Sequence, residues 1–360
     1  MRTALIGNGL SVAHNQDLSS SKLFEELKSR FSSVSAPDTT EAAFKKLATS
    51  LDPGTGYDLE NLIGPLDILD GAMSALEDLT ALTDGLGPSL SDSVAETRAV
   101  TKQLYRHGVS HVLELIAERS LGHGTDHAKA LCARVAQLGD AWCLATLNYD
   151  GILVSAALEV LKGNIADLAD GRPAAEFKID VVPGGPIITG NRLRTVADLP
   201  CIYSVVNLHG SLGWLRSGSD HVKFQIDALR GAGYWSAWRE DRTQWAPSVI
   251  LTNQAAKGRL IREYPFRFAY SYFFDRLVES KHWYIIGYGF GDRVLNEVLR
   301  RVARTAFPSA RKCYVVTKEG SPDPAMILDV LGVDLMRNTT ICDHGMPAAI
   351  DCVHSPGHFT

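Results

Sequence analysis

The sequence predicts an α/β protein with a Rossmann-like, mainly parallel sheet and a large helical insertion after the first strand. Short apolar runs typical of buried strands alternate with stretches of helical periodicity, a pattern that favours parallel strands joined by right-handed crossovers. Three of these runs end in polar residues, at Thr146–Asp150, Asn207–Ser211 and Ile285–Asp292. Open α/β sheets bind ligands at the carboxyl ends of their strands, so these three stretches predict a site.

The first predicted strand, Thr3 to Ile6, runs into a glycine turn at Gly7 and Gly9, and we expect Ser11 to cap the helix that follows. From about Leu23 to Leu138, apolar residues recur at three- and four-residue spacing, which predicts helices. The helical faces are marked by Leu59, Leu62, Ile63 and Leu66, and by Val112, Leu115 and Ile116.

The remaining elements alternate along the second half of the chain. Strands are predicted at Trp142–Thr146, Ile202–Leu208, Val249–Leu251, Trp283–Ile286 and Cys313–Val316. Helices are predicted at Gly151–Lys162, Phe266–Glu279 and Asp292–Ala303. The segments Ile165–Leu199 and Arg216–Trp245 are rich in glycine, proline and polar residues, so we expect them to be excursions around the site. We expect three parts: residues 1–15 with 140–320, a helical insertion at 16–139, and a C-terminal helix, strand and tail at 321–360.

Composition is that of an ordinary globular protein. Of the 360 residues, 45% are hydrophobic and 21% are charged. The net charge of −5 lacks the positive charge that is typical of nucleic-acid binding. No apolar stretch is long enough to span a bilayer and no signal segment opens the chain, so we expect a cytoplasmic protein. The six cysteines form no Cys-x-x-Cys pair, which argues against a zinc ribbon and predicts buried thiols.

The opening glycine turn differs from the fingerprint of NAD-dependent dehydrogenases. That fingerprint needs a third glycine where this chain has Val12, and an acidic residue about 20 positions on that ends a second strand. Here Glu25 and Glu26 lie within a helical pattern, so hydride transfer is disfavoured. Gly7 and Gly9 are explained equally well by a phosphate-binding turn and by a tight strand-to-helix turn.

Asn148 and Asp150 stand at the end of a predicted strand, where an amide and a carboxylate can act on one ribose. An amide offers both a donor and an acceptor to water or to a hydroxyl. The alternative is that they cap the helix that begins near Gly151.

His209 follows another apolar run and can accept a proton near neutral pH, while Gly210 beside it would permit close approach of a ligand. A lone histidine at a strand end is also compatible with a structural role. The glycine-rich turn that ends in Asp292 can bind a ligand, and Asp292 can cap the next helix whether or not it does.

Other residues are weaker candidates. His107 and His111, like His123 and His127, are four apart, but no acidic metal motif accompanies them and we expect a solvated helix face instead. An aromatic cluster could be a lid, an oligomer contact or plain core; its members are Tyr234, Trp235, Trp238 and Trp245.

Together, these motifs resemble the Sir2-like, sirtuin-related NAD-consuming domains, and more closely the zinc-free bacterial branch found in anti-phage defence. The resemblance rests on Gly7, Gly9 and Ser11; on Asn148-Tyr-Asp150; on Leu208-His-Gly-Ser211 with Trp214; and on Gly287-Tyr-Gly-Phe-Gly-Asp292 with Asn296. The stretch Tyr57–Ile63 is similar to a helical insertion motif of that branch.

The resemblance implies roles for these residues, with NAD as the substrate. Asn148 would orient the attacking water and the nicotinamide ribose, Asp150 would support the nicotinamide pocket, and His209 would act on the ribose hydroxyls as a general base. The implied NAD-binding residues are Gly7, Asn8, Gly9, Ser11, Gly210, Gly287, Tyr288, Gly289, Asp292 and Asn296.

The expected activity is therefore that of an NAD glycohydrolase, releasing nicotinamide and ADP-ribose, in a defence effector that depletes NAD. We expect no metal, a homo-oligomer and a partner protein of a defence system. The alternatives are a non-catalytic sensor or scaffold that binds NAD or ADP-ribose, and a zinc-free deacylase. The missing cysteine pairs put the deacylase activity in doubt.

Overall fold

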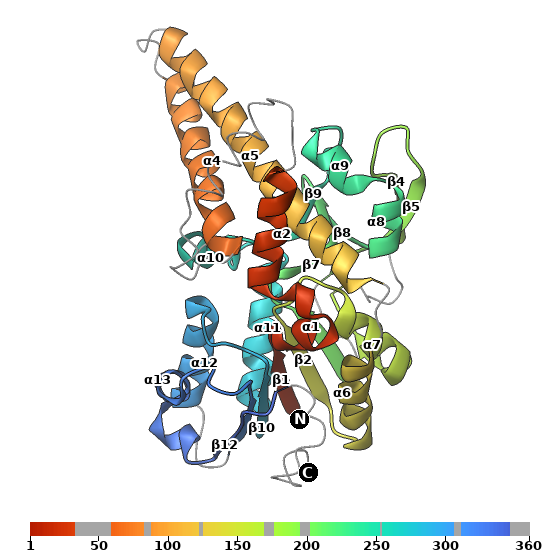
Figure 1. Cartoon of the computed structure of the whole chain (residues 1–360), viewed down its shortest axis with the longest axis vertical. Helices are drawn as coiled ribbons and strands as arrows, with labels where there is room; N and C mark the ends of the chain where they lie inside the picture. Colours follow the sequence, from red (N-terminus) through yellow and green to blue (C-terminus); the bar gives the residue numbers. More distant parts are fainter. Residues whose placement is uncertain are drawn as a thin grey trace.

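The computed structural model describes residues 1–32, 59–82, 88–121, 125–168, 176–194, 202–252, 254–305 and 311–345. Its main feature is a seven-stranded sheet in the order β12-β11-β10-β1-β2-β6-β3, in which every pairing is parallel (Figure 1). The strands are β1 (Arg2–Ile6), β2 (Trp142–Thr146), β3 (Ile165–Ala166), β6 (Tyr203–Asn207), β10 (His282–Ile286), β11 (Lys312–Val316) and β12 (Thr339–Cys342). The predicted α/β, Rossmann-like class is confirmed.

Both faces of this sheet are covered, which explains why most of its strands are mainly apolar rather than alternating. On β1, Ala4 and Ile6 belong to a buried cluster with residues of α6 (Asp126–Gln137) and α7 (Ile152–Leu161). Leu5 faces the other way and shares a cluster with the helices of the opposite layer. These helices are α11 (Phe266–Glu279), α12 (Arg293–Thr305) and α13 (Pro324–Met336).

The strand order reverses at β1, and this reversal creates the crevice in which such sheets bind ligands. From β1 the chain adds β2 and β6 on one side, then returns to place β10, β11 and β12 on the other. The sheet extends past residue 320, because β12 pairs with β11 at its edge.

A second sheet of five strands was not predicted. It is antiparallel, in the order β4-β5-β8-β7-β9, with bounds β4 (Glu176–Asp180), β5 (Ile187–Arg192), β7 (Gly210–Ser217), β8 (Asp220–Phe224) and β9 (Ala246–Val249). The segments 165–199 and 216–245, which we expected to be excursions, contribute β4, β5 and β8 to this sheet, and the strand predicted at Val249–Leu251 overlaps β9 only at Val249. Polar residues and glycines obscure these strands because part of this sheet is exposed; Ile187, for example, is 72% exposed.

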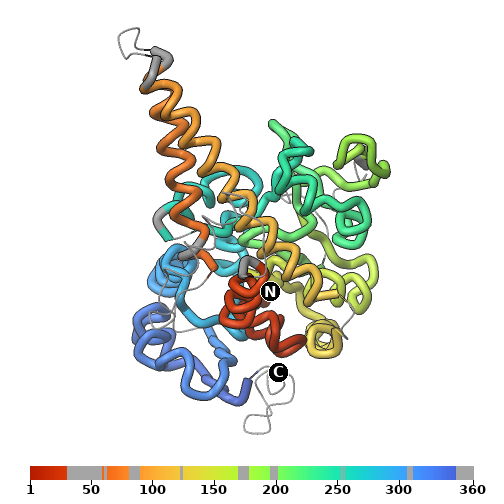
Figure 2. The backbone as a smooth tube through the Cα atoms, turned by 45° about the horizontal axis from the view of Figure 1, so that its top comes forward, coloured from red at the N-terminus to blue at the C-terminus, as the bar shows by residue number. Residues whose placement is uncertain are grey.

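The helical insertion is present in the described residues. After α1 (Gly9–His14), it comprises the 3-10 helix η1 (Gln16–Leu18), α2 (Ser20–Ser32), α4 (Leu59–Leu82), α5 (Pro88–Ser120) and α6. Helices α4 and α5 form a long pair that projects from the body of the molecule (Figures 1 and 2). Where α4 and α5 meet the body, the predicted apolar faces are buried, including Ile63, Val112 and Leu115. Tyr57 and Asp58 of the insertion motif lie outside the described residues.

The aromatic cluster is core. Tyr234, Trp235 and Trp238 lie on α9 (Tyr234–Arg239), which packs against α5, and all three are at most 4% exposed. The Tyr234 hydroxyl donates to the carbonyl oxygen of Trp245 at 2.9 Å. The short helices α8 (Ile226–Gly231) and α10 (Gln254–Leu260) complete the described elements.

The expectation of a solvated histidine face on α5 was wrong. His107 is 8% exposed, and burial together with Arg239 lowers the pKa of His111 to about 3. His123 lies outside the described residues. In the described ranges, Cys132, Cys143, Cys313 and Cys342 form no disulfide and are buried, and their burial was predicted. None of the described helices is both long and apolar enough to cross a membrane.

Candidate functional site

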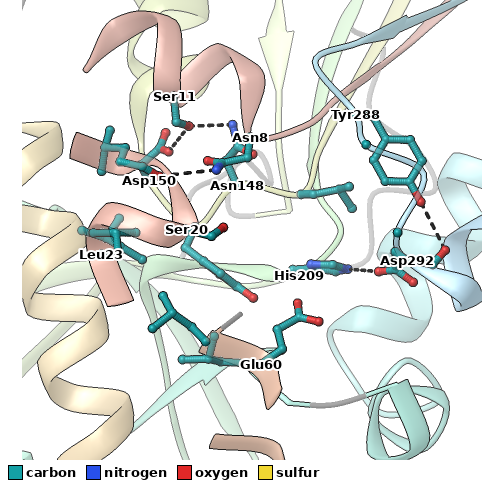
Figure 3. A pocket seen from close by; sticks show the side chains of 18 of the residues that line it. Asn8, Ser11, Ser20, Leu23, Glu60, Asn148, Asp150, His209, Tyr288 and Asp292 are labelled. Atoms are coloured by element: carbon teal, nitrogen blue, oxygen red, sulfur yellow. Dashed lines mark hydrogen bonds and ion pairs between the residues drawn. The ribbon is translucent and has the colours of Figure 1, made fainter. Parts of the chain in front are cut away.

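A cavity of about 300 Å³ lies at the carboxyl ends of β1, β2 and β10, where the strand order reverses (Figure 3). Nine of the predicted site residues line it: Asn8, Ser11, Asn148, Asp150, His209, Gly287, Tyr288, Gly289 and Asp292. Residues of the helical region cover it, including Leu23, Glu60 and Ile116. Its volume is at the lower end of the range for small-molecule sites.

Two glycine turns cross at the edge of this cavity with no room for side chains. The Gly9 N–H donates to the Gly287 carbonyl oxygen at 3.0 Å. A Cβ atom on Gly7 would lie 2.5 Å from that same oxygen, and one on Gly9 would lie 2.6 Å from the Gly287 Cα atom. Gly287 itself has a φ of +62°. Gly7 and Gly9 do not line the cavity, so their glycine character is required by this backbone crossing.

Gly289 and Gly291 differ from these three glycines. Both line the cavity, and a Cβ atom on either would meet nothing within 4 Å. Neither has a positive φ. Because the fold leaves room for a side chain here, the bare backbone keeps space open for a ligand.

We expect Gly9→Ala and Gly289→Ala to have opposite effects. Gly9→Ala forces the two turns apart and should lower the free energy of unfolding by at least about 2 kcal/mol, as overpacking of a tight contact does. Gly289→Ala should leave stability within about 0.5 kcal/mol and weaken ligand binding. Urea unfolding and calorimetric titration of each variant with NAD measure these effects. Equal loss of stability in both variants would contradict the assignment.

Ser11 links the first turn to the second strand end. It lies within α1 rather than at the N-cap, which is Asn8, so the predicted capping role was wrong. The Ser11 hydroxyl donates to Asp150 Oδ2 at 2.5 Å and accepts from Asn148 Nδ2 at 2.7 Å (Figure 3). A serine here therefore joins the two side chains predicted to act on the ribose.

Asn148 is oriented by both hydrogens of its amide. Nδ2 donates to the Gly7 carbonyl oxygen at 3.1 Å as well as to Ser11. The side chain is 7% exposed and lines the cavity. Since Nδ2 is engaged, the carbonyl oxygen Oδ1 is the atom that can accept from a water molecule or a hydroxyl group.

Asp150 has the predicted capping contact and also lines the cavity. Its Oδ1 accepts from the Ile152 N–H at 3.1 Å, in the first turn of α7. Burial raises the pKa of Asp150 above its ordinary value, against the opposing effect of hydrogen bonds from Ser11 and Ile152. Asp150 can therefore cap α7 and face a ligand at the same time.

His209 adjoins a buried group of charged side chains. Its Nε2 lies 3.1 Å from Asp292 Oδ2, and the Lys257 ammonium lies 3.0 Å from the same oxygen. Lys257 also donates to both carboxylate oxygens of Glu60, at 3.0 and 2.9 Å. His209, Asp292 and Lys257 are 4%, 7% and 1% exposed. The pairing with Asp292 favours the tautomer with a proton on Nε2, which leaves Nδ1 to accept.

The contacts within this group of side chains fix the charges of Asp292 and Lys257. Burial would raise the pKa of Asp292, but His209 and Lys257 hold it well below its ordinary value. Burial would lower the pKa of Lys257, but Glu60 and Asp292 raise it overall. Asp292 and Lys257 are therefore both ionised near neutral pH.

We expect Lys257→Met to lower the free energy of unfolding by about 3–5 kcal/mol near neutral pH, because it leaves two carboxylates without their buried cation. The stability linked to the depressed pKa of Asp292 is present above the ordinary value of 3.8 and is lost as the pH falls through the folded-state value. The difference between wild type and variant should therefore shrink only in strong acid.

Urea unfolding of both proteins between neutral and acidic pH tests this expectation. The matched control is Lys223→Met. Lys223 lies on β8, is more exposed and pairs with Asp167, so we expect a smaller loss of free energy of unfolding. A Lys257→Met variant as stable as wild type would show that the cation is dispensable.

The glycine-rich turn from Gly287 to Asp292 is held in place by hydrogen bonds within the protein. Asp292 Oδ1 accepts from the Leu295 N–H at 3.0 Å, which confirms the predicted cap of α12. The Tyr288 hydroxyl donates to Asn296 Oδ1 at 2.8 Å, and Asn296 Nδ2 donates to the Phe290 carbonyl oxygen at 2.6 Å. Asn296 does not line the cavity, so it supports the turn from behind.

Gly210 is also placed away from the cavity. It has a φ of +83°, and a Cβ atom there would lie 2.1 Å from the Ser248 carbonyl oxygen. The contact between β7 and β9 explains this glycine without a ligand.

Glu60 and Lys257 are the site residues that sequence reasoning missed. Neither lies at a strand end. Lys257 is only 1% exposed, which is exceptional for a lysine unless it is paired. The one available signal was the insertion motif, which contains Glu60. Among the described residues, no group of three or more histidine, cysteine or acidic side chains could hold a metal ion.

The arrangement combines groups suited to hydrolysis at a sugar carbon. Asn148 Oδ1 can hold a water molecule, His209 can take a proton, and Asp292 can stabilise the imidazolium that results. The glycine turns present backbone to one end of the cavity. No cation besides Lys257 lines the cavity within the described ranges, and Lys257 is neutralised by two carboxylates.

Comparisons with known proteins add little to this picture. No protein-family model matches the sequence, and no curated protein matches it significantly. Among solved structures, this chain is similar to one described as "Structural Basis for the Mechanism and Regulation of Sir2 Enzymes". The two share 11% sequence identity over 97% of this chain and 90% of that chain, with a TM-score of 0.43. A similarity of this size identifies neither an activity nor a ligand.

Proposed function

We propose that this protein is an NAD glycohydrolase, which uses water to cleave NAD into nicotinamide and ADP-ribose. The observation that carries the proposal is the convergence of Asn148, Asp150, His209 and Asp292 on one cavity at the reversal of the strand order. These residues come from three separate strand ends; the sequence predicts catalytic roles for Asn148, Asp150 and His209, and an NAD-binding role for Asp292.

Two features of the cavity suit parts of the NAD molecule. The open backbone at Gly289 and Gly291 suits a diphosphate or ribose that must approach closely. Apolar side chains such as Leu23 and Ile116 line part of the cavity, which suits the flat face of a base or of nicotinamide.

In the proposed reaction, the oxygen of a water molecule held by Asn148 bonds to the anomeric carbon of the nicotinamide ribose. The bond from that carbon to the pyridinium nitrogen breaks, and its electron pair neutralises the departing nicotinamide. The transition state is oxocarbenium-like, as in glycoside hydrolysis. His209 receives the proton that the water loses, through Nδ1, and the Asp292 carboxylate stabilises the resulting positive charge.

We further propose that the protein is a defence effector that depletes NAD during infection, and that assembly lowers the activity of the isolated chain without abolishing it. The aromatic segment offers no surface for this assembly, because Trp235 and Trp238 are buried. The projecting α4–α5 pair does, since Leu79 and Val100 on it are 53% and 47% exposed. Closed homo-oligomers commonly bury such surface, and a partner protein of the defence system would release the active state.

Two other functions are separated from this one by a single assay. A sensor or scaffold would bind NAD or ADP-ribose and return it unchanged. A zinc-free deacylase would release nicotinamide only when an acylated peptide is supplied. The purified chain should therefore be incubated with NAD, with and without an acetyl-lysine peptide, and nicotinamide quantified by chromatography. We expect release at the same rate in both samples, and release that depends on the peptide would overturn the proposal.

A further inference from the structure

Tyr149 lies between Asn148 and Asp150 in the chain, and the proposed reaction gives it no role. It lines the cavity together with Asn148 and His209. Its hydroxyl donates to the Ile250 carbonyl oxygen at 2.7 Å, the usual length of a good hydrogen bond from a hydroxyl group. Because its hydrogen is committed to the backbone, this hydroxyl is suited to holding the chain in place.

Ile250 connects Tyr149 to His209 through its backbone. Its N–H donates to the His209 carbonyl oxygen at 2.9 Å, and its carbonyl oxygen accepts from Tyr149. Ile250 directly follows β9 and is fully buried. Both of its backbone groups therefore belong to one path, which runs from the strand end that carries Asn148 to the backbone of the histidine.

Two further contacts join the same segments. The Leu212 N–H, on β7, donates to the Tyr149 carbonyl oxygen at 2.9 Å. The ring centroids of Tyr149 and His209 are 6.3 Å apart, within the range of favourable contact between aromatic rings. Tyr149 thus holds residues 209–212 through its hydroxyl, its backbone and its ring.

We propose that Tyr149 is a positioning residue, which sets the distance between Asn148 and the imidazole of His209. This inference rests on the proposed function, in which Asn148 holds the water and His209 receives its proton. Asn148 and Tyr149 are neighbours in the chain, so a contact that fixes Tyr149 to His209 also fixes the two reacting groups. A misplacement of about 1 Å between such groups can cost ~10²-fold in rate.

Tyr149→Phe tests the proposal, because it removes the hydroxyl and keeps the ring. The buried Ile250 carbonyl oxygen then loses its donor, which favours a shift of the segment that holds His209. We expect kcat for NAD hydrolysis to fall by about tenfold or more and KM to change by less than about twofold. This split is expected because the hydroxyl holds the protein chain rather than the substrate.

Tyr234→Phe is the matched control. The Tyr234 hydroxyl also donates to a backbone carbonyl oxygen, that of Trp245, at 2.9 Å. Tyr234 is fully buried and does not line the cavity. The two variants should therefore lose similar stability in urea unfolding, but only Tyr149→Phe should lose kcat. An unchanged kcat in Tyr149→Phe, or an equal loss in both variants, would overturn the proposal.

The imidazole of His209 gives a second readout, which needs no turnover. Nuclear magnetic resonance of nitrogen-15-labelled protein without NAD reports its Nε2, the atom that lies 3.1 Å from Asp292. We expect this resonance, identified by its loss in His209→Ala, to shift in Tyr149→Phe and to stay in place in Tyr234→Phe. A resonance unchanged in Tyr149→Phe would also overturn the proposal.

The two readouts separate this inference from the proposed function. If the wild-type chain releases no nicotinamide from NAD, the proposed function fails, and the Nε2 resonance alone decides whether Tyr149 positions His209. If the wild-type chain hydrolyses NAD and Tyr149→Phe does so at the same rate, the function stands and the positioning role of Tyr149 is wrong.

Discussion

Replacing Asn148 with alanine is expected to reduce NAD hydrolysis by ~10²–10⁴-fold, the cost of losing an oriented catalytic contact. The variant has no Oδ1 to hold the water. It also removes the donor to Gly7 and to Ser11, so we expect the free energy of unfolding to fall by about 1–3 kcal/mol. Rates from chromatography of nicotinamide and ADP-ribose, measured at saturating NAD, give the catalytic effect.

The loss of stability requires its own control. Ile327→Val removes one methylene from a fully buried side chain on α13 and should cost about 0.5–1.5 kcal/mol. Ile327 does not line the cavity, so this variant should keep its activity. If Asn148→Ala hydrolyses NAD as fast as Ile327→Val, then Asn148 does not hold the water.

His209→Ala should lose ~10²–10⁴-fold in kcat/KM, because the variant has no group to receive the proton. In the wild-type protein, only the neutral imidazole can act as a base, so kcat/KM should fall towards acidic pH. Asp292 remains charged over that range, since its pKa lies well below the ordinary value. Asp292 therefore does not produce the acid limb, which leaves His209 and Asp150, whose pKa is raised by burial, as its candidates.

Asp292→Asn is the matched variant for this assignment. It keeps a group of the same shape beside Nε2 but removes the charge that stabilises the imidazolium. We expect an intermediate loss of kcat/KM, because the protonated imidazole formed in the reaction is less stable without this charge. A flat pH profile in the wild type, together with an active His209→Ala variant, would assign His209 a structural role.

The parallel sheet could be predicted because both of its faces are buried. Strands such as Trp142–Thr146 are continuous apolar runs, and the polar residue that ends each run marks the edge where a ligand binds. Asn148, Asp150 and His209 could be selected on this basis. The antiparallel sheet escaped prediction because exposed strands such as Ile187–Arg192 carry glycine and polar residues.

The remainder of the site depends on tertiary contacts. Lys257 has no sequence pattern of its own, and its role becomes visible only once Glu60 of α4 and Asp292 lie beside it. The glycines show the same limit. Gly9 and Gly289 both occur in glycine-rich turns, but only packing reveals that one avoids a backbone clash and the other faces open space.

The proposal of NAD hydrolysis is tested most directly by the products formed from NAD and water alone. The purified chain should be incubated with NAD in the absence of any peptide, and both products should be quantified over time. The proposal predicts nicotinamide and ADP-ribose in equal amounts, and loss of both in the Asn148→Ala variant. Intact NAD recovered from a protein that binds it in this cavity would contradict hydrolysis and support the sensor or scaffold instead.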